Sequence, residues 1–412
     1  MPGPAAYDAS SASEQPVTLP DAPTRRINEA LSIQPPLSRR GHGPGLVLFL
    51  SNETSSAGGD KPLDPEPVQK WAEEGFAVAF VTVYPTIDVQ QILAEAARAL
   101  IDLGDTLDIS DKFGVIVYDT NCLQEVVESV KHDERFTCVV GFGGGEDKPE
   151  SSKPLLLNTT QLQSRVISAP HVEIHEYPVA SPHFVIPTSG AYDPGSAALA
   201  HTRTLVFLRK HVGGPHFDLE VIWDEHTYFE FEARSVAKTM GTMVAEPYVN
   251  HIPTMTGGVG RENLTRFYRD HFIFSNPADA RLQVVSRTVG PDRVSLCTDE
   301  FVYHITHDRQ VDWLLPGVPA THKKLSIPMM AVVNIRGDRL YNEHIWWDQA
   351  TALKQAGLLQ EYISFPTPEG SGKVLRLPVA GVESAAMLLD ESKGRSNEML
   401  GEGWGMVDKK DS

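Results

Sequence analysis

The chain has 412 residues, of which 41% are hydrophobic and 22% are charged, a composition typical of folded proteins at a length natural for two domains. Asp and Glu number 54 against 36 Lys and Arg, so the net charge of −18 argues against binding of nucleic acids or anionic membrane surfaces. Three cysteines without paired spacing exclude a disulfide framework, and the apolar runs are too short to span a membrane. We therefore expect a cytoplasmic protein.

The first half of the chain combines short apolar runs with helical patterns. Runs such as residues 45–50 and 77–83 carry apolar side chains on both faces, which is typical of strands buried on both sides of a sheet. Amphipathic stretches separate these runs, and a long helix over residues 194–212 ends at Gly213. We predict a doubly wound, mostly parallel sheet with helices on both faces. The predicted strands are 45–50, 77–83, 113–118, 137–140 and 154–157, and the predicted helices are 64–74, 88–103, 123–132 and 194–212.

The second half places helices before strands. Residues 218–243 have the pattern of one or two amphipathic helices, and residues 257–260 that of a glycine-rich turn. Residues 336–338, Arg-Gly-Asp, predict a hairpin between two long strands. Helices followed by consecutive strands predict an α+β cone, in which a bent antiparallel sheet encloses a pocket. The other predicted elements are strands 247–252, 281–289, 294–306, 325–335 and 340–348, and helices 261–272 and 382–390.

Changes in composition divide the chain into four predicted segments. Residues 1–40, rich in Pro, Ser and Ala, are expected to form a flexible N-terminal arm. Residues 41–214 hold the α/β half, and residues 215–364 hold the α+β half. Residues 365–412, rich in Gly, Glu, Ser and Lys, are expected to form a C-terminal arm. The chain is thus predicted to fold as two domains between two arms.

Three segments of the first half point to one family. Residues 43–50, Gly-Pro-Gly-Leu-Val-Leu-Phe-Leu, look like a first core strand. Residues 136–145, Phe-Thr-Cys-Val-Val-Gly-Phe-Gly-Gly-Gly, look like a strand that enters a nucleophile elbow. Residues 177–184, Tyr-Pro-Val-Ala-Ser-Pro-His-Phe, look like a loop that carries a catalytic histidine. In these segments the chain resembles the dienelactone hydrolases (carboxymethylenebutenolidases), which implies an α/β-hydrolase fold.

The nucleophile that this resemblance implies is absent. The centre of the elbow should be Ser or Cys, and here it is Gly143. The acid of the triad is missing from residues 158–163, so only His183 matches. We therefore predict that the first half has no serine- or cysteine-type hydrolase activity. The alternative is that Cys122 or Cys138 replaces the nucleophile, whereas our prediction treats both as core thiols.

The second half carries another resemblance, over residues 216–360. Residues 258–267, Gly-Val-Gly-Arg-Glu-Asn-Leu-Thr-Arg-Phe, are followed by a last strand that ends in Ile-Trp-Trp-Asp-Gln, and then by Gln-Ala-Gly. These features resemble SnoaL-like polyketide cyclases of the nuclear transport factor 2-like superfamily. The resemblance implies that Asp348 is the general acid and base of an intramolecular aldol closure.

Alternation along the last strand predicts which side chains line the pocket. Successive residues of a strand face opposite sides, so one face holds Asn342, His344, Trp346 and Asp348. An Asp beside a Trp in an apolar cavity has a raised pKa and can exchange a proton near neutrality. The predicted catalytic residues are Asp348, His344 and His251, and the predicted substrate pocket adds Trp346, Asn342 and Tyr248. The alternative is that this polar face forms a dimer contact.

The opposite face of the last strand predicts a partner surface. It holds Tyr341, Glu343, Ile345 and Trp347. A Trp on the outside of the sheet would be costly to leave in water, and exposed apolar clusters commonly mark interfaces. We therefore predict a homodimer formed mainly by the second half.

Histidines are frequent in the second half and offer a candidate metal site. His226 and Glu230 lie four residues apart on a predicted helix, so both can face one point. With His251 and His344 they would suit iron, zinc or manganese, which accept imidazole and carboxylate ligands. The alternative is that these histidines satisfy buried polar groups. No other cofactor is predicted.

Three functions remain open at this point. The leading hypothesis is an enzyme of the cyclase, isomerase or lyase type, which acts by acid/base chemistry on a hydrophobic, oxygenated, aromatic or polyketide-like small molecule. The second is a metal-dependent oxygenase or hydrolase that uses the histidines of the same cone. The third is a non-catalytic dimeric binding or scaffold protein with a dead hydrolase domain.

Overall fold

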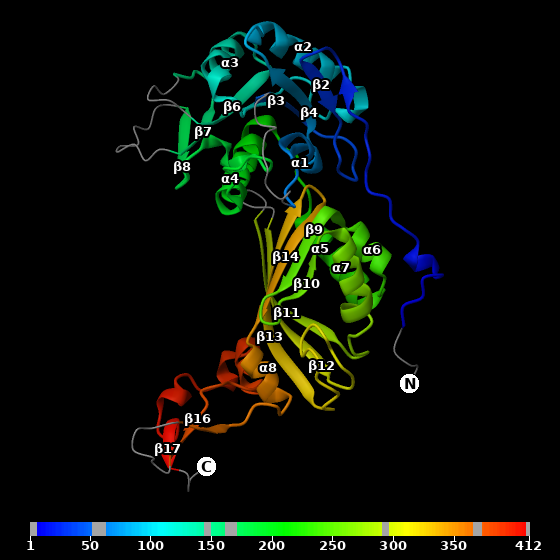
Figure 1. Ribbon diagram of the computed structural model, residues 1–412, viewed down its shortest axis with the longest axis vertical. Coiled ribbons are helices and arrows are strands. Elements are labelled where there is room, and N and C mark those ends of the chain that lie inside the picture. The colour runs from blue at the N-terminus through cyan, green and yellow to red at the C-terminus, as the bar shows by residue number, and fades with distance from the viewer. Residues whose placement is uncertain are drawn as a thin grey trace.

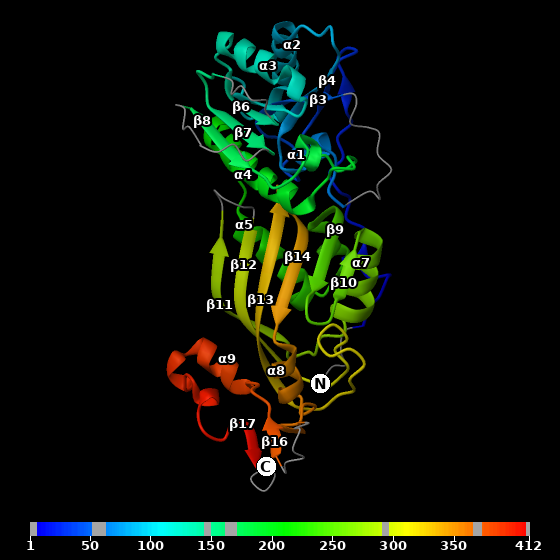
Figure 2. The same cartoon turned by 60° about the vertical axis from the view of Figure 1, so that its left-hand side comes forward.

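The computed structural model describes residues 6–51, 63–143, 150–160, 171–290, 296–365 and 373–408. An α/β unit, the first domain, lies at one end of an elongated molecule (Figure 1). A long curved sheet with its helices, the second domain, lies in the middle, and a small C-terminal unit lies at the other end (Figures 1 and 2). None of the helices in the described ranges combines the length and the apolar character needed to cross a bilayer.

The first domain is built on a mixed sheet whose strands have the order β1-β2-β4-β3-β5-β6-β7-β8. Strands β3 to β8 pair in parallel, and β2 runs antiparallel beside β4. The centre is buried on both faces, as the apolar runs predict. The strands are β1 (Arg25–Arg26), β2 (Leu31–Gln34), β3 (Gly45–Ser51), β4 (Ala77–Val83), β5 (Phe113–Val117), β6 (Phe136–Phe142), β7 (Leu155–Thr159) and β8 (Val172–Glu176).

Helices cover both faces of this sheet and define two cores. Helices α2 (Val89–Ile101) and α3 (Leu123–Ser129) pack on one face. Helices α1 (Pro67–Glu73) and α4 (Pro194–Val212) pack on the other face, which is turned toward the second domain (Figure 1). The prediction of a doubly wound, mostly parallel sheet is confirmed, whereas descent from a dienelactone hydrolase stays a prediction.

The second domain is built on a sheet with the order β10-β9-β14-β13-β12-β11. All neighbours are antiparallel except β9 and β14, which are parallel. The strands are β9 (Met243–His251), β10 (Thr256–Val259), β11 (Arg281–Val289), β12 (Leu296–Thr306), β13 (Lys324–Arg336) and β14 (Arg339–Trp347). The prediction of a bent, mainly antiparallel sheet is thus confirmed.

Three helices close one face of this sheet and complete the cone (Figures 1 and 2). They are α5 (Leu219–Thr227), α6 (Val236–Gly241) and α7 (Arg261–Phe267). Helices α5 and α7 each continue into a π-helical turn, Tyr228–Glu232 and Tyr268–Phe272 respectively. Such turns are frequent at functional sites because they re-aim side chains. The large apolar core of the domain lies between these helices and the sheet.

The structure contains several elements that the sequence analysis did not predict. Strand β2 lies within the predicted N-terminal arm, so the first sheet begins before residue 41, and Leu31 is fully buried. Strands β1 and β8, which are short and partly polar, were not predicted. The predicted glycine-rich turn at residues 257–260 is largely strand β10. A side chain at Gly257 would collide with Val249 O of β9, so glycine there permits close strand pairing.

The two arms pack differently. Part of the N-terminal arm runs along the second domain, where Glu14 accepts hydrogen bonds from the backbone N–H groups of Val236 and Ala237 at the start of α6. The C-terminal unit holds α8 (Gln349–Gln355), α9 (Val382–Leu389), and a small sheet of β15 (Tyr362–Ser364), β16 (Lys373–Arg376) and β17 (Gly405–Asp408). Helix α9 packs against β13.

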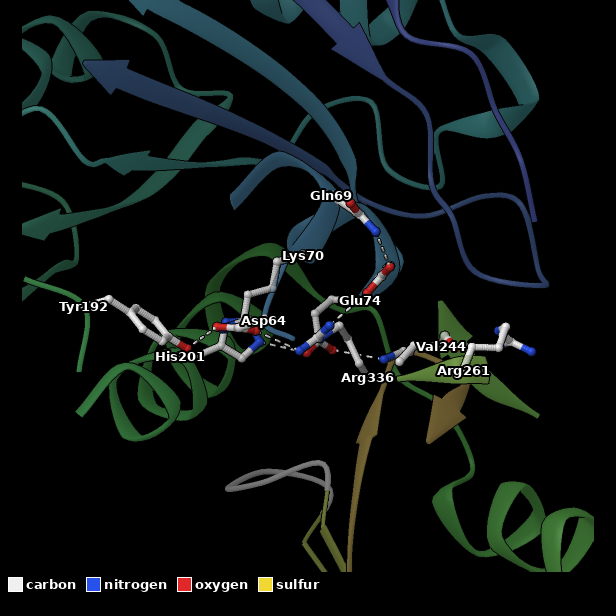
Figure 3. A network of polar contacts seen from close by, with 11 residues as sticks. Asp64, Gln69, Lys70, Glu74, Tyr192, His201, Val244, Arg261 and Arg336 are labelled. Carbon is white, nitrogen blue, oxygen red and sulfur yellow. Dashed lines mark hydrogen bonds and ion pairs between the residues drawn. The ribbon is translucent and has the colours of Figure 1, made fainter. Parts of the chain in front are cut away.

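The β13–β14 hairpin docks the second domain onto α1 of the first domain. Arg336, at the end of β13, forms ion pairs with Asp64 at 3.0 Å and with Glu73 at 2.9 Å (Figure 3). The backbone N–H of Gly337 donates to Glu74 at 3.1 Å. A Cβ at Gly337 would lie 2.1 Å from Glu73 O, so the turn must be glycine to approach this closely. The predicted hairpin is therefore confirmed, and it joins the domains.

Candidate active site

Three ionisable side chains meet inside the second domain. His226 lies in the last turn of α5, Glu230 in the π-helical turn that follows, and Glu343 in the middle of β14. All three are buried, and their ligand atoms lie within 4.8 Å of one another. The extra residue of the π-helical turn and the curvature of β14 bring them together from distant parts of the sequence. We call these three residues the cone triad.

His226 is held at both ring nitrogens. Its Nδ1 lies 2.6 Å from Thr242 Oγ1, and because that hydroxyl donates to Thr239 O at 2.7 Å, Nδ1–H is the donor. Its Nε2 lies 3.1 Å from Glu230 Oε1 and 3.1 Å from Glu343 Oε1. Only the Glu230 contact has hydrogen-bond geometry. Among the described residues, Glu343 Oε1 has no hydrogen-bond partner.

Burial and mutual charge set the protonation of the cone triad. Burial alone lowers the pKa of His226, but the carboxylates of Glu230 and Glu343 outweigh it and raise that pKa to about 10. Burial raises the pKa of Glu343, and the nearby imidazole of His226 offsets this only in part. Two ionised carboxyl groups beside one imidazolium would leave a net negative charge in a buried site, which burial disfavours. The raised pKa of Glu343 therefore marks it as the carboxyl group of the cone triad that exchanges a proton most readily.

A cavity of about 50 Å³ reaches the cone triad. The polar part of its wall includes the carboxyl groups of Glu230, Glu343 and Asp299, and Val284, half exposed on β11, marks where it meets the surface. Most of the remaining wall is aromatic or aliphatic and includes Trp223, Phe231, Val249, Tyr268, Phe272, Phe301, Tyr303, Trp313, Met329 and Ile345. A compact apolar molecule thus has a complementary surface beside three carboxyl groups.

Tyr268 adds a hydrogen-bond donor to the same cavity. Its hydroxyl lies 3.4 Å from His226 Nε2, and its side chain is on the cavity wall. Burial, reinforced by the carboxylates of Glu343 and Glu230, raises the pKa of Tyr268 well above its ordinary value. The phenol therefore stays protonated and can donate to an oxygen atom of a bound compound.

His251, one of the predicted catalytic residues, also lines this cavity. Its ring lies among aromatic side chains, with centroid distances of 5.0 Å to Trp313 and 5.5 Å to Phe272. Its Nδ1 is 3.2 Å from Thr256 O, and burial lowers its pKa to about 4. His251 is therefore neutral near pH 7, with Nδ1–H donating to the backbone.

The face of β14 that lines the cavity is the opposite of the predicted one. Glu343 and Ile345 line the cavity, and Trp347 is buried in the core beside it. His344 and Trp346 lie on the outer face of the sheet, where their rings contact each other at 5.7 Å. Burial lowers the pKa of His344. From Asn342 onward the strand alternates as predicted, but the face assigned to the pocket and the face assigned to the dimer are exchanged. Tyr341 lies at a β-bulge and lines the same outer pocket as Asn342.

Two predicted pocket residues line a different cavity. Tyr248 and Asn342 belong to a pocket between the domains, on the outer side of the sheet. Trp347 cannot serve as the exposed dimer contact, because it is 8% exposed inside the second domain. The homodimer itself stays a prediction.

Asp348 caps a helix outside the cavity. Its Oδ1 accepts a hydrogen bond from Ala350 N at 3.0 Å, and its Oδ2 accepts one from Thr351 Oγ1 at 2.7 Å, at the start of α8. The side chain is exposed and is not on the cavity wall. At this position Asp348 acts as the N-cap of α8, and it is not placed to transfer a proton in the cavity.

Replacement of Asp348 by Ala is expected to lower the free energy of unfolding by about 1 kcal/mol, the usual cost of losing an N-cap side chain. Asp348→Ser, which keeps a capping oxygen, should restore most of the loss. Urea denaturation measures both. Unchanged stability together with a large loss of turnover would instead support a catalytic role for Asp348.

The elbow of the first domain has no room for a nucleophile. Gly143 has φ 89°, and a Cβ placed on it would lie 2.5 Å from Thr120 Cγ2 and 3.0 Å from Pro182 Cβ. His183 lies in the short helical turn Pro182–Val185. Gly144, Gly145 and residues 161–163, which the sequence analysis also considered, lie outside the described residues. The geometry agrees with the loss of the nucleophile at residue 143.

The thiols of Cys122 and Cys138 are expected to be inert in the folded protein. Both are buried, and burial raises the pKa of each to about 12, so neither forms a thiolate near neutrality. Mass spectrometry after brief iodoacetamide treatment should find both unlabelled in native protein and labelled in urea. Rapid labelling of either cysteine in the native protein would instead support the alternative of a cysteine nucleophile.

The metal-ligand candidates from the sequence converge only in part. His226 and Glu230 meet as predicted, and Glu343 joins them in place of His251 and His344. Glu343 was missed because its face of β14 was assigned to the outside. The available signal was the apolar character of that face, since Ile345 and Trp347 accompany Glu343.

No family model and no curated protein matches this chain. Among solved structures, it is similar to a protein described as a SnoaL-like polyketide cyclase from Shewanella putrefaciens, at 10% identity and a TM-score of 0.29 over 36% of this chain and 90% of that chain. A second such protein, from Jannaschia, has 13% identity and a TM-score of 0.28 over 36% of this chain and 100% of that chain. A Burkholderia pseudomallei NTF2-like protein of unknown function has 13% identity and a TM-score of 0.26 over 34% of this chain and 96% of that chain. Similarity at this level says nothing about what the present chain binds or transforms.

Proposed function

We propose that the second domain is an enzyme of the cyclase, isomerase or lyase type, which moves a proton on a compact, mainly apolar, oxygenated ring compound. One observation carries the proposal. Glu343 is buried and faces an aromatic cavity, and its Oε1 atom makes an ion-pair contact with His226 Nε2 at 3.1 Å but no hydrogen bond among the described residues. Natural proteins rarely keep such a group in a core, and active sites are the common exception.

The chemistry follows from the protonation states of the site. When it is ionised, Glu343 can take a proton from the carbon next to a carbonyl, and when it is protonated, it can return that proton to the compound; a raised pKa favours both steps near neutrality. The Tyr268 hydroxyl is placed on the same wall to donate to the carbonyl oxygen, where negative charge develops as that proton leaves. His226, held by Thr242, keeps a positive charge beside Glu230 so that both carboxyls can remain buried.

The nature of the cavity narrows the substrate class. Its wall is mostly aromatic, and its open volume of about 50 Å³ is well below that of the usual ligand pocket, so a very compact molecule fits better than a large, long or charged one. Convergent titratable groups in the cavity also favour an enzyme over a non-catalytic scaffold.

The proposal is tested by proton exchange on small ring ketones. Cyclobutanone and cyclopentanone in D₂O are incubated with the full chain, and loss of the α-proton signals is followed by NMR. Faster exchange than in buffer is expected, and Val284→Trp, which blocks the cavity where it meets the surface, should abolish it. Exchange that is just as fast in the blocked variant would place the chemistry outside the cone.

A metal-dependent oxygenase or hydrolase is the second candidate, favoured by the convergence of three donor atoms within 4.8 Å. With its Nδ1–H donated to Thr242, His226 in the neutral form would offer Nε2 to a metal ion together with both carboxylates. This reading requires neutral His226 and ionised Glu343, the reverse of the acid/base reading. Elemental analysis of purified protein separates them. Stoichiometric Zn, Mn or Fe that disappears in Glu230→Gln protein would support the metal reading, whereas metal-free active protein would exclude it.

A further inference from the structure

A second and larger cavity lies between the two domains. Its volume is about 430 Å³, and it opens between α1 and α4 of the first domain and the outer face of β9 and β14. It is separate from the cone, because Asn342 lines this pocket whereas Glu343, the next residue of β14, faces the cone. The acid/base site makes no use of this pocket. Figure 3 shows part of its polar wall.

Three of the four charged side chains in this wall are already paired with one another, and the fourth, Glu246, is exposed. Lys70 Nζ lies 2.5 Å from Asp64 Oδ2, and Arg336 contacts the other oxygen of Asp64 at 3.0 Å. Arg336 also pairs with Glu73. An anionic ligand would need an unpaired cation. A cationic ligand would have to approach Lys70 and Arg336, and the exposed carboxylate of Glu246 would offer it little attraction in water. The pocket therefore favours a neutral ligand.

His201 supplies a hydrogen-bond acceptor. Its Nε2 lies 2.8 Å from Glu74 Oε1 and donates to that buried carboxylate, and its ring packs on Trp71 at 4.5 Å. Burial lowers the pKa of His201 to about 4, so the imidazole is neutral and Nδ1 carries a lone pair. No hydrogen bond to Nδ1 occurs among the described residues, and His201 is on the pocket wall. A hydroxyl group of a ligand can donate to this atom.

Tyrosines form the rest of the recognition surface. Tyr192, Tyr248 and Tyr341 line the pocket, and most of its exposed wall is apolar. Burial raises the pKa of Tyr341 to about 12, so its hydroxyl remains protonated. Asn342 Oδ1 accepts from Asn334, and the Asn342 amide also bonds to the Tyr341 side chain, which leaves one N–H to donate to a ligand oxygen. Rings of this kind pack well against flat aromatic compounds.

We propose that the pocket between the domains binds a neutral, flat, hydroxylated aromatic compound, whose hydroxyl donates to His201 Nδ1 and whose ring packs among the tyrosines. The site is independent of the chemistry proposed for the cone, and ligands of the two sites contact opposite faces of β14.

Calorimetry with three matched probes tests the site and its class. The full chain is titrated with 2-naphthol, 2-naphthoate and 2-naphthylmethylammonium, which share a ring system and differ in charge. 2-Naphthol should bind with one-site behaviour, at least about tenfold more tightly than either charged probe. Tighter binding of a charged probe, or no binding of 2-naphthol up to millimolar concentration, would overturn the proposal.

Two substitutions on α4 and one in the cone locate the binding. Ala198 is exposed and lines the pocket, so Ala198→Phe fills it without disturbing the core. Leu199, its neighbour, is 46% exposed and does not line the pocket, so Leu199→Phe is the matched control. Ala198→Phe should weaken 2-naphthol at least about tenfold, whereas Leu199→Phe and the cone-blocking Val284→Trp should not. Wild-type affinity in Ala198→Phe, or lost affinity in Val284→Trp, would show that 2-naphthol binds elsewhere.

Discussion

Glu343→Gln is expected to lower turnover in the cone by about 10²–10⁴, the usual contribution of a positioned acid/base group. Gln keeps the size and shape of the side chain but cannot exchange a proton. Because Glu343 is buried and contacts His226, a substitution that preserves its shape is needed to test its chemical role without disturbing the packing. The α-proton exchange of the best ring ketone, followed by NMR, measures the effect.

Asp348→Asn is the matched control, because it makes the same chemical change at an exposed helix cap outside the cavity. Its turnover should stay within about threefold of wild type, since Asn also caps helices. Thermal melting of each variant checks that the fold is intact. Normal turnover in Glu343→Gln protein, or a large loss in Asp348→Asn protein, would contradict the assignment of the site.

His226→Leu is expected to lower the free energy of unfolding by about 3–5 kcal/mol, the cost of leaving a buried charge without its partner. The substitution removes the imidazolium that lies 3.1 Å from both Glu230 and Glu343. His344→Leu, on the outer face of the same sheet, should cost less than about 1 kcal/mol. Urea denaturation compares the two, and equal losses would show that the cone triad has no special electrostatic role.

Histidine NMR tests the sign of the pH dependence at the cone triad. The pKa of His226 is raised from 6.5 to about 10, so the folded protein keeps a proton that the unfolded chain releases above pH 6.5. The stability that this proton contributes is complete below pH 6.5 and is lost as the pH rises toward 10. At pH 8, His226 should still show the chemical shifts of an imidazolium, and His251 those of a neutral ring. A neutral His226 at pH 8 would favour the metal reading.

Much of the first domain could be predicted because its strands are buried on both faces. Such strands have to be apolar throughout, and β4 and α4 have the bounds that the sequence predicted. Strands β1 and β8 lie at the edges of the sheet and are partly exposed, so they lack that signal. Strand β2 lies in the Pro-rich arm, and its pairing with β4 and β1 defines it.

The site could be predicted only in part, because alternation shows which residues share a face but not which face turns inward. On β14 that choice depends on packing against α5 and α7, which a single strand does not reveal. The face with Ile345 and Trp347 is the more apolar one and is the one that enters the core, carrying Glu343 with it. His226 and Glu230 were found because their helical spacing is local, whereas their partner on β14 depends on the tertiary fold.

Infrared spectroscopy of the Glu343 carboxyl at pH 7 tests the central claim most directly. The difference spectrum between wild type and Glu343→Gln isolates the carboxyl signal of this one residue. Because burial raises the pKa of Glu343 and His226 supplies the balancing charge, the spectrum should contain the carbonyl band of a protonated carboxylic acid. A carboxylate band in its place at pH 7 would show that Glu343 is ionised, and would contradict the account of the cone as a site that stores and transfers a proton.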